Sequence, residues 1–467
     1  MTNPTRLKEL LECDKPLSQR WSIKDGYTLP VYESQSGYQA IRQALKQTPD
    51  EVINLVKTVG IRGRGGAGFP TGSKWSFVPK ESKHPKYFVV NADESEPGTF
   101  KDRYIMERDP HLLLEGIMIG AYAIGAHKAY IFIRGEFALA IARVKAAIEE
   151  ANQKNYLGER IFGADFSLQI YVHPGAGAYI CGEETALLES LEGKRGYPRL
   201  KPPFPAVKGA FSGPTVVNNV ETVACVPLAY SKGPEWFKKY GTEKCGGTKL
   251  YCISGAVVKP GTYELPHHVT LRELIYDIAG GLKPGRKLKA VIPGGSSVPL
   301  LTTREAPQLL PPLKEGEVRP QGTKIPEEID VTMDFESLRK VNSFLGSCGT
   351  IVIDDQTCMV RALLNLMDFY HHESCGQCTP CREGTGWLNR MLQRMENGFG
   401  TLQDIETMLS AGKNIMGNTI CALGDAAAMP TISYIERFRE EFERHVTEKC
   451  CPYPTEEEIM PSFVERT

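Results

Sequence analysis

Hydrophobic positions in the first half of the chain alternate between helical and strand spacing. Apolar residues recur at helical spacing within residues 48–60, with Thr48 or Asp50 as a candidate N-cap and Gly60 as a candidate end. The pattern predicts further helices over 36–49, 110–126 and 136–153, and strands within 86–98 and over 129–134 and 166–172. Such alternation is typical of an α/β fold.

The pattern changes at about Gly246. Short strands are predicted over 249–254, 261–265 and 289–292, with a helix over 270–279 that begins with a capping box of Thr270 and Glu273. These elements indicate a small α+β domain. Residues 299–330 are rich in proline and charge, so we expect a long surface loop or insertion there, with contact to a neighbouring subunit as a hypothesis.

From about Gly346 onward the chain is predicted to be mostly helical. Helical periodicity covers 357–372, 383–397, 401–411 and 431–447, and Thr401 with Asp404 is a candidate cap for the third. The patterns therefore divide the chain into an N-terminal arm with helices (1–60), an α/β domain (61–245), an α+β domain (246–345) and a helical domain (346–467).

Composition excludes several classes of protein. The 467 residues have a net charge of −1, which favours neither nucleic acid nor an anionic membrane. The longest apolar stretch, 116–126, is far shorter than the ~20 residues that span a bilayer. The acidic N-terminus is unlike a signal or transit peptide. The 13 cysteines are an odd number, so we expect a reduced protein with some cysteines as metal ligands.

The most unusual stretch is a glycine-rich loop over residues 62–75, which reads RGRGGAGFPTGSKW. Glycines let a ligand approach the backbone, successive amides form anion-binding nests, and Arg62, Arg64 and Lys74 add positive charge. The loop is suited to a flat phosphorylated ligand, and an ordinary surface loop is the alternative. A helix precedes it, and Pro70 with Gly72 predicts no helix after it, so it is not a standard Rossmann turn.

Polar side chains gather at two further turns. Residues 91–96 form an acidic cluster at the end of a predicted strand, where ligands bind in open α/β sheets; a solvated polar turn is the alternative. A second glycine-rich turn, 175–193, places Glu183 and Glu184 at the start of a helix, where they either stabilise the helix end or accept hydrogen bonds from ligand hydroxyls. Asn218 and Asn219 also lie near a helix start, so one is a candidate N-cap.

The clearest chemical signal is CGQCTPC at residues 375–381. Three cysteines at this spacing suit a [4Fe–4S] cluster, whose fourth ligand must then be remote; Cys421 is the best candidate, with Cys450 and Cys451 as alternatives. Zinc is the rival metal, although structural zinc prefers two separated pairs. The remaining cysteines have no ligand spacing and are expected to be buried as small hydrophobic residues: Cys13, Cys181, Cys225, Cys245, Cys252, Cys348 and Cys358.

A flat phosphorylated cofactor and one iron–sulfur cluster in one chain favour an electron-transfer flavoprotein. A flavin accepts a hydride as an electron pair, and a cluster accepts electrons singly. The sequence contains no nucleophile elbow, zinc-protease helix or Walker loop. We therefore expect no side chain to act as a catalytic acid or base.

Taken together, these motifs are recognisable. Residues 62–75, 91–103 (NADESEPGTFKDR), 175–193 and 373–384 (ESCGQCTPCREG), with the remote Cys421, resemble the NADH-binding flavoprotein subunits of respiratory complex I and the related diaphorase subunits of hydrogenases and formate dehydrogenases. The resemblance covers about 35–445. It implies a multidomain α/β fold: a Rossmann-like FMN-binding domain, a ubiquitin-like (β-grasp) domain, and a C-terminal helical bundle with the cluster.

The resemblance also implies site residues. The residues implied to contact FMN are Gly63, Arg64, Gly65, Gly66, Lys74, Asn91, Asp93, Glu94, Tyr179, Gly182, Glu183, Glu184, Asn218 and Asn219. Those implied to contact NADH are Phe69, Lys74, Phe77, Glu96, Glu184 and Phe204. The implied ligands of the [4Fe–4S] cluster are Cys375, Cys378, Cys381 and Cys421.

By the same resemblance, the chain oxidises NADH on FMN and passes single electrons through the cluster to quinone. The implied partners are a small thioredoxin-like [2Fe–2S] subunit and a large multi-cluster iron–sulfur subunit of a peripheral arm, on the cytoplasmic face of the bacterial inner membrane and without direct membrane insertion. Extra thioredoxin-like or ferredoxin-like modules, common in hydrogenase-linked members, are missing from the sequence. A complex I subunit is thus favoured, with a diaphorase as the alternative.

Overall fold

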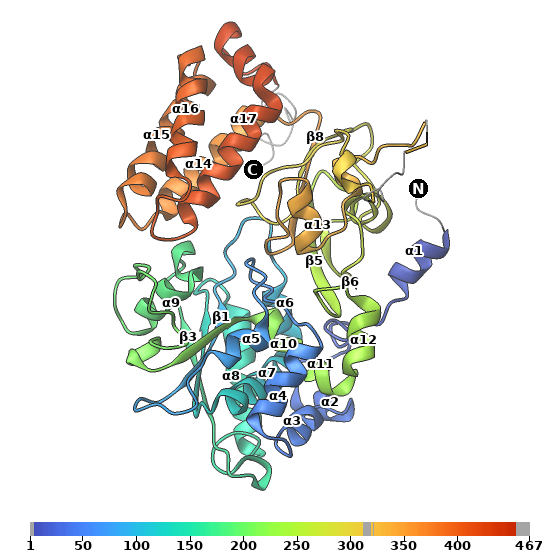
Figure 1. Ribbon diagram of the computed structural model, residues 1–467, viewed down its shortest axis with the longest axis vertical. Helices are drawn as coiled ribbons and strands as arrows, with labels where there is room; N and C mark the ends of the chain where they lie inside the picture. Colours follow the sequence, from blue (N-terminus) through green and yellow to red (C-terminus); the bar gives the residue numbers. More distant parts are fainter. Residues whose placement is uncertain (1–3, 312–318, 321, 454–467) are drawn as a thin grey trace, which may run out of the picture.

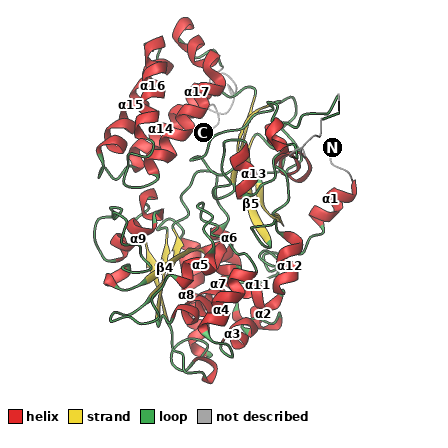
Figure 2. Cartoon of the chain, viewed as in Figure 1, coloured by secondary structure: helices red, strands yellow, loops and turns green. Residues whose placement is uncertain are grey.

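The computed structural model describes residues 4–311, 319–320 and 322–453. Three bodies meet around a central region: an α/β body, a smaller mixed body, and the helical bundle α14–α17 (Figure 1). Colouring by secondary structure separates the strands of the first two bodies from this bundle (Figure 2). Within the described ranges, no helix combines the length and the apolar character needed to cross a bilayer.

The N-terminal region contains short helices that pack on the α/β body. Thr48 and Glu51 form a capping box at the start of α4, which confirms Thr48 as the N-cap of the helix predicted over 48–60. The helix predicted over 36–49 is shorter than expected. The helices are α1 (Pro4–Leu11), α2 (Leu29–Ser34), α3 (Gln39–Ala44) and α4 (Pro49–Thr58).

The α/β body is built on a parallel sheet of strand order β3-β2-β1-β4. Its strands are β1 (Tyr87–Ala92), β2 (Lys128–Ile133), β3 (Gln169–Pro174) and β4 (Thr215–Asn219). Its helices are α5 (Thr71–Ser76), α6 (Asp102–Arg108), α7 (Pro110–Ile124), α8 (Ala138–Gln153), α9 (Glu184–Leu191), α10 (Val220–Ala224), α11 (Val226–Ser231) and α12 (Gly233–Tyr240). Short 3-10 turns are η1 (Ile161–Gly163), η2 (Tyr179–Gly182) and η3 (Ala210–Ser212). Because the chain order reverses on either side of β1, a ligand crevice is expected between β1 and β4.

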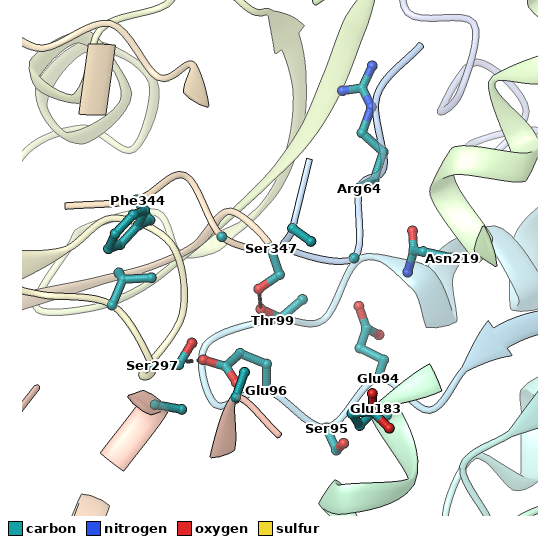
Figure 3. A pocket seen from close by; sticks show the side chains of 18 of the residues that line it. Arg64, Glu94, Ser95, Glu96, Thr99, Glu183, Asn219, Ser297, Phe344 and Ser347 are labelled. Atoms are coloured by element: carbon teal, nitrogen blue, oxygen red, sulfur yellow. Dashed lines mark hydrogen bonds between the residues drawn. The ribbon is translucent and has the colours of Figure 1, made fainter. Parts of the chain in front are cut away.

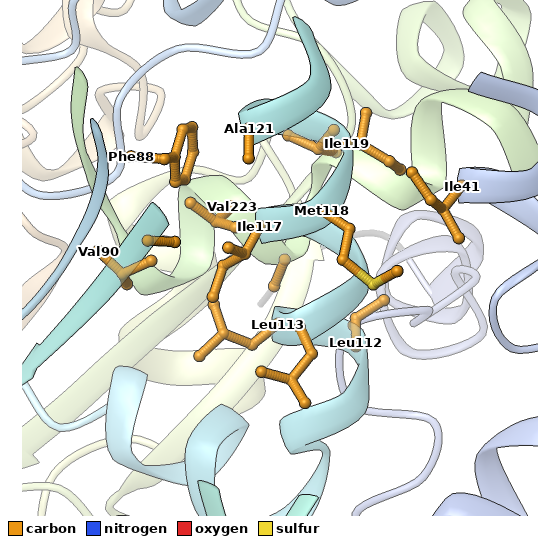
Figure 4. Close-up of a cluster of buried hydrophobic side chains, with 14 of the residues drawn as sticks. Ile41, Phe88, Val90, Leu112, Leu113, Ile117, Met118, Ile119, Ala121 and Val223 are labelled. Atoms are coloured by element: carbon orange, nitrogen blue, oxygen red, sulfur yellow. The ribbon is translucent and has the colours of Figure 1, made fainter. Parts of the chain in front are cut away.

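The core of this body surrounds α7, which is buried along almost its whole length. Leu113 and Ile117 lie close to Phe88 and Val90 of β1, as Figure 4 shows. A Cβ on Gly116 would lie 2.1 Å from the carbonyl oxygen of Val223, so glycine permits the close approach of α7 to α10. The prediction of a buried helix over 110–126 is confirmed.

One local prediction was wrong: a short helix, α5, does follow the glycine-rich loop. Pro70 occupies the N-cap position, so its missing N–H removes no helical hydrogen bond. A Cβ on Gly72 would lie 2.8 Å from the backbone nitrogen of Lys57, so Gly72 permits α5 to lie directly against α4. Packing against α4 therefore outweighs the low helix propensity of Gly72.

The second body contains a mixed sheet of order β6-β5-β8-β7, in which β5 pairs antiparallel with β6 and parallel with β8. Its elements are β5 (Thr248–Gly255), β6 (Gly261–Pro266), the π-helical turn η4 (Glu273–Ile278), β7 (Leu288–Ile292), η5 (Pro307–Leu309), η6 (Glu328–Asp330), α13 (Phe335–Lys340) and β8 (Gly349–Asp354). The expectation of mostly helical structure from Gly346 missed β8. This strand extends the second body beyond residue 345.

The proline-rich stretch 299–330 is only partly a surface loop. Leu300, Leu301 and Ala306 are fully buried, and Leu301 pairs with Val291 of β7. Its flanks are therefore part of the core of the second body. Residues 312–318 and 321 of the expected insertion lie outside the described residues.

The C-terminal region is helical, as predicted, and contains α14 (Met359–Glu373), α15 (Thr379–Glu396), α16 (Leu402–Ile415) and α17 (Leu423–Glu448). The Thr401–Asp404 capping box is present at the start of α16. The CxxCxxC motif lies at the junction of α14 and α15, with Cys375 and Cys378 before α15 and Cys381 in its first turn, and Cys421 lies just before α17.

Candidate functional site

A cavity of about 550 Å³ lies where the three bodies meet. The glycine-rich loop contributes Gly65 and Gly66, the end of β1 contributes Asn91 and Asp93, and β4 contributes Asn219. These positions agree with the crevice expected at the carboxyl ends of β1 and β4. Figure 3 shows side chains of the wall, with Glu94 and Glu96 from the segment after β1, Glu183 from the turn before α9 and Asn219 from the end of β4.

Two features of the wall fit a bound cofactor. One Asp93 carboxylate oxygen is buried without a hydrogen-bond partner, so it is free to accept a bond from a ligand hydroxyl. Burial raises the pKa of Asp93 to about 7. Gly66 has a φ of +132°, which only glycine adopts readily, and its backbone lines the cavity. The residues present therefore fit the flavin that the resemblance implies.

The cavity wall includes most of the residues implied to contact FMN, but several are already engaged with the protein. Glu94 accepts hydrogen bonds from the backbone N–H groups of Lys101, Asp102 and Arg103, at distances of 2.7, 2.8 and 3.1 Å, at the start of α6. Burial raises the pKa of Glu94 to about 7. Glu94 therefore positions the segment after β1 as well as lining the cavity.

The two asparagines implied for FMN occupy different places. Asn219 is the N-cap of α10, its side chain accepting from the backbone of Glu221 and Thr222, and it also lines the cavity. Asn218 accepts a hydrogen bond of 2.8 Å from the indole N–H of Trp75 and is not part of the cavity wall. The N-cap alternative is thus observed for Asn219.

The positive charges of the glycine-rich loop are paired rather than free. Arg62 forms an ion pair of 2.6 Å with Glu336, and Lys74 forms one of 2.8 Å with Glu184. The Arg64 guanidinium points away from the cavity (Figure 3), is fully buried, and contacts His267 at 3.0 Å. The positive charge expected beside the loop is therefore present, and each cation lies close enough to carboxylates or other polar groups to be paired.

Arg64 belongs to a buried ionic network beneath the cavity. Glu221 lies 2.9 Å from the Lys101 ammonium, 3.2 Å from that of Lys249 and 3.8 Å from the Arg64 guanidinium. These cations hold the pKa of Glu221 well below its usual range despite burial. The network joins the glycine-rich loop to α10 and β5.

The second glycine-rich turn contributes Tyr179, Gly182 and Glu183 to the wall. Glu183 caps α9, accepting from the backbone of Thr185 and Ala186, and pairs with Lys201 at 2.9 Å. The helix-end alternative is therefore observed for Glu183. Glu184 pairs with Lys74 and, like Lys74 and Gly63, lies outside the wall.

The residues implied to contact NADH divide into two groups. Glu96 lines the cavity, where its carboxylate accepts hydrogen bonds of 2.7 Å from the Tyr179 hydroxyl and from the Ser297 N–H. Burial raises the pKa of Glu96. Phe69, Phe77 and Phe204 lie outside the wall and are 48%, 58% and 58% exposed, and the rings of Phe69 and Phe77 are 6.1 Å apart. Such exposed aromatic faces are available to stack on a base.

Sequence reasoning missed the part of the wall that comes from the second body. Ser297, Phe344 and Ser347 line the cavity, and Ser347 bonds to Thr99 at 2.5 Å. Ser297 lies in the turn PGGSS after β7, Ser347 lies in the turn GSCG before β8, and Phe344 comes shortly before that second turn. Gly294 packs against the backbone of Leu345, so the two turns meet only in the folded chain. Glycine–serine turns were the only signal in the sequence.

The four cysteines implied as cluster ligands come together beside this cavity. Cys381 is buried, while Cys375, Cys378 and Cys421 are partly buried against the same apolar cluster. Burial and the proximity of Cys381 and Cys375 raise the pKa of Cys421 to about 12. Four cysteine thiolates are the usual ligands of a [4Fe–4S] cluster, so the donor set fits an iron–sulfur cluster. Cys421 also lines the cavity.

Comparisons with known proteins match this division of the chain. Residues 56–228 match the Nuo51 FMN-binding domain, 249–318 the SLBB domain, and 361–445 the NADH-ubiquinone oxidoreductase-F iron-sulfur binding region. The SLBB match covers part of the body expected to be ubiquitin-like. The fold is thus a mixed α/β multidomain arrangement with a parallel sheet, an SLBB domain and a helical iron–sulfur region.

Two relatives of known sequence and one solved structure match this chain over most of its length. An NADH-quinone oxidoreductase F subunit of Rhizobium meliloti is 54% identical over 92% of this chain and 97% of its own. The corresponding F subunit of Streptomyces coelicolor is 48% identical over 94% and 92%. The air-oxidised NAD+-reducing [NiFe]-hydrogenase has a chain that superposes with a TM-score of 0.74 at 32% identity, over 95% of this chain and 68% of that one. The chain belongs to the family of NADH-quinone oxidoreductase F subunits.

Proposed function

We propose that the chain is the NADH-oxidising subunit of an NADH-quinone oxidoreductase (complex I). Family membership and the matches to FMN-binding and iron–sulfur regions support this function. When bound, FMN accepts a hydride from NADH, and a [4Fe–4S] cluster accepts electrons one at a time. The observation that carries the proposal is the position of Cys421, which lines the same cavity as Gly66 and Asp93.

The chain's own residues bind and orient in this proposal. Gly65 and Gly66 admit the flavin to the backbone, and Asn91, Asp93 and Asn219 offer polar atoms to it. Tyr179, Gly182 and Glu183 close one side of the cavity. Glu94 and the ionic network of Glu221 fix the loops from beneath. Gly63, Arg64, Lys74, Glu184 and Asn218 act indirectly, by holding the loop and the end of β4.

For NADH, we propose that the exposed rings of Phe69, Phe77 and Phe204 stack on the adenine. Glu96 and Glu184 lie near the hydroxyls of NADH in this proposal, and Lys74 is shared between FMN and NADH. Cys375, Cys378, Cys381 and Cys421 hold the cluster. No side chain is required as an acid or base.

The second body is proposed to be a ubiquitin-like domain. Its order β6-β5-β8-β7, with a parallel central pair flanked by antiparallel strands, supports this assignment. The proposed domains are then 1–60, 61–245, a ubiquitin-like domain starting at 246 and extending through β8, and the helical cluster domain to 467.

The proposed partners are a small thioredoxin-like [2Fe–2S] subunit and a large multi-cluster iron–sulfur subunit. The assembly is proposed to be a peripheral arm on the cytoplasmic face of a bacterial inner membrane. A diaphorase is the second candidate, favoured by the likeness to the hydrogenase chain at 32% identity, against 54% for the Rhizobium relative. Quinone reduction by the complex purified with this chain supports the first, and hydrogen-dependent NAD+ reduction the second.

The test is an anaerobic NADH titration of the chain with its small partner, followed by optical and electron paramagnetic resonance spectra. Flavin bleaching with a reduced four-iron signal is expected. Bleaching without that signal calls for iron analysis, and a zinc content in place of iron contradicts the electron path. No response of the flavin contradicts the proposed function as a whole.

A further inference from the structure

A second group of metal-ligating side chains lies in the C-terminal bundle, outside the site described above. The ligand atoms of Cys358, Glu396, His445 and Cys451 all lie within 4.8 Å of one another. They come from the start of α14, the end of α15, α17 and the segment after α17. Sequence spacing predicted burial as a small hydrophobic residue for Cys358 and an alternative role in the cluster for Cys451.

This group is separate from the iron–sulfur cysteines. Cys358 precedes the first residue of α14, whereas Cys375 follows its last, and α14 has 15 residues. At 1.5 Å per residue, the helix separates the two sites by roughly 22 Å. Cys451 is therefore too distant to complete the cluster, and its alternative role as a fourth cluster ligand is ruled out by the fold.

Contacts with neighbouring residues orient three of the four donors, those of His445, Glu396 and Cys358. His445 is fully buried, and its Nδ1 lies 2.7 Å from the carbonyl oxygen of Glu441, which only accepts hydrogen bonds. Nδ1 therefore bears the hydrogen, and in the neutral ring Nε2 has a free lone pair. That Nε2 lies 3.3 Å from the Cys358 sulfur and 3.7 Å from Glu396 Oε2. A carbonyl bound to the remote ring nitrogen is the usual support of a metal-binding histidine.

The carboxylate of Glu396 is also held in place by a neighbouring side chain. Arg361 binds one oxygen of Glu396 through Nε and a terminal nitrogen, at 2.9 and 2.8 Å. The other oxygen, Oε2, is buried without a hydrogen-bond partner and faces His445. An unpartnered buried carboxylate oxygen is costly unless a cation completes it. Arg361 also donates its backbone N–H to the Cys358 sulfur at 3.3 Å.

We propose that these four residues bind a structural Zn2+ ion. Two thiolates, one imidazole and one carboxylate form a complete tetrahedral donor set for zinc. Bond lengths of about 2.3 Å to sulfur and 2.0–2.2 Å to nitrogen or oxygen require ligand atoms roughly 3.3–3.8 Å apart, so the observed group needs only a small contraction. The sulfur ligands favour zinc over calcium or magnesium.

The zinc ion cross-links the helices at the end of the bundle that lies far from the iron–sulfur cysteines. It joins the start of α14 and the end of α15 to the C-terminal part of α17. The segment after α17 is held nearby, since Lys289 bonds to the Tyr453 hydroxyl at 2.9 Å and pairs with Glu441 at 2.6 Å. The role is structural and independent of NADH oxidation.

The test measures zinc per chain in the flavin- and cluster-containing protein, expressed with added zinc. Elemental analysis should give one zinc per chain, and zinc-edge X-ray absorption should show two sulfur neighbours. Cys358→Ser and Cys451→Ser should lose the zinc. Cys450→Ser is the matched control, since Cys450 is exposed and adjacent, and it should retain the metal. Unchanged flavin and iron contents show that each variant is folded.

A milder substitution tests the zinc site even if the cysteine variants fail to fold. Arg361→Gln leaves all four donors and removes only the support of Glu396, so zinc affinity should fall about 10- to 100-fold in competition with a chelating dye. Zinc-free protein with free thiols overturns the proposal. So does a Cys358–Cys451 disulfide found by mass spectrometry in place of the metal, or equal zinc in all four variants.

Discussion

The ionic network beneath the cavity gives a sharp prediction through Glu221→Gln. The amide keeps the size of the side chain and an oxygen to accept the Leu250 N–H, 2.9 Å from Glu221 in the structure. It removes only the negative charge. Arg64, Lys101 and Lys249, whose side chains are at most 1% exposed, would then lose the carboxylate that they share, while Lys101 keeps its ion pair of 2.7 Å with Asp102.

The loss of stability expected for Glu221→Gln is large because the network is buried. Removing one partner of a buried ion pair destabilises a protein by about 3–5 kcal/mol, because the remaining charge is neither solvated nor paired. We therefore expect the local opening constant around β4, α10 and β5 to rise by roughly two to four orders of magnitude. Flavin content should also fall, since Arg64 belongs to the cavity loop.

The assay is native-state hydrogen exchange read by mass spectrometry, because a multidomain chain does not unfold in one step. Peptides that cover 215–255 report the local free energy of opening. The matched control is Glu406→Gln, which removes the same charge from an exposed pair with Arg439 at 2.5 Å and should cost less than about 1 kcal/mol.

A second substitution tests whether unpaired buried charge causes the loss of protection. In the Glu221→Gln background, Lys249→Met removes one excess buried cation and should recover part of the lost protection, as a coupled pair requires. If Glu221→Gln and Glu406→Gln differ by less than about 1 kcal/mol over 215–255, the network does not hold the loop and the reasoning fails.

Three further predictions concern the cavity and the cluster. Gly66→Val should abolish FMN binding, because it forces a branched residue to φ +132° in the cavity wall, whereas Gly193→Val, at φ +79° in open space, should retain flavin on the purified chain. Cys421→Ala should lose the four-iron spectrum and keep FMN, with Cys450→Ala as the control; an intact cluster in Cys421→Ala refutes the ligand set. Burial raises the pKa of Asp93 from 3.8 to about 7. Between these two pH values the folded, flavin-free chain binds a proton that the unfolded chain releases. The free energy of unfolding should therefore fall by as much as about 4 kcal/mol as the pH rises from 3.8 to about 7. Thermal unfolding against pH should show a flatter profile for Asp93→Asn, and an unchanged slope would assign the effect to another group.

Local signals in the sequence predicted local structure well. The capping boxes at Thr48, Thr270 and Thr401 mark real helix starts, since each needs only residues three positions apart. The short helix α5 was missed because Gly72 is unfavourable in isolation and is used here for contact with Lys57. Strand β8 was missed because its partner β5 lies about a hundred residues earlier in the chain, at Cys252 opposite Gly349.

The candidate site likewise contains residues that the sequence predicted and residues that it did not. Gly66, Asp93 and the CxxCxxC loop stand out because their residue types are unusual together. Ser297 and Ser347 do not, because ordinary turns acquire a role only when the second body docks on the first. The grouping of Cys358 with His445 is likewise invisible in spacing, since the two residues approach only after the bundle closes.

The composition of the cavity wall has a consequence for stability. Gly66 belongs to the α/β body, Ser347 to the second body, and Cys421 to the segment that leads into the bundle. A ligand that contacts all three favours the docked arrangement over any arrangement in which one body has moved, by an amount set by its affinity and concentration. FMN bound across this cavity would therefore stabilise the contacts between the bodies as well as the loop that holds it. By the same linkage, changes at the interface of the bodies outside the cavity wall are expected to weaken FMN binding without touching the flavin.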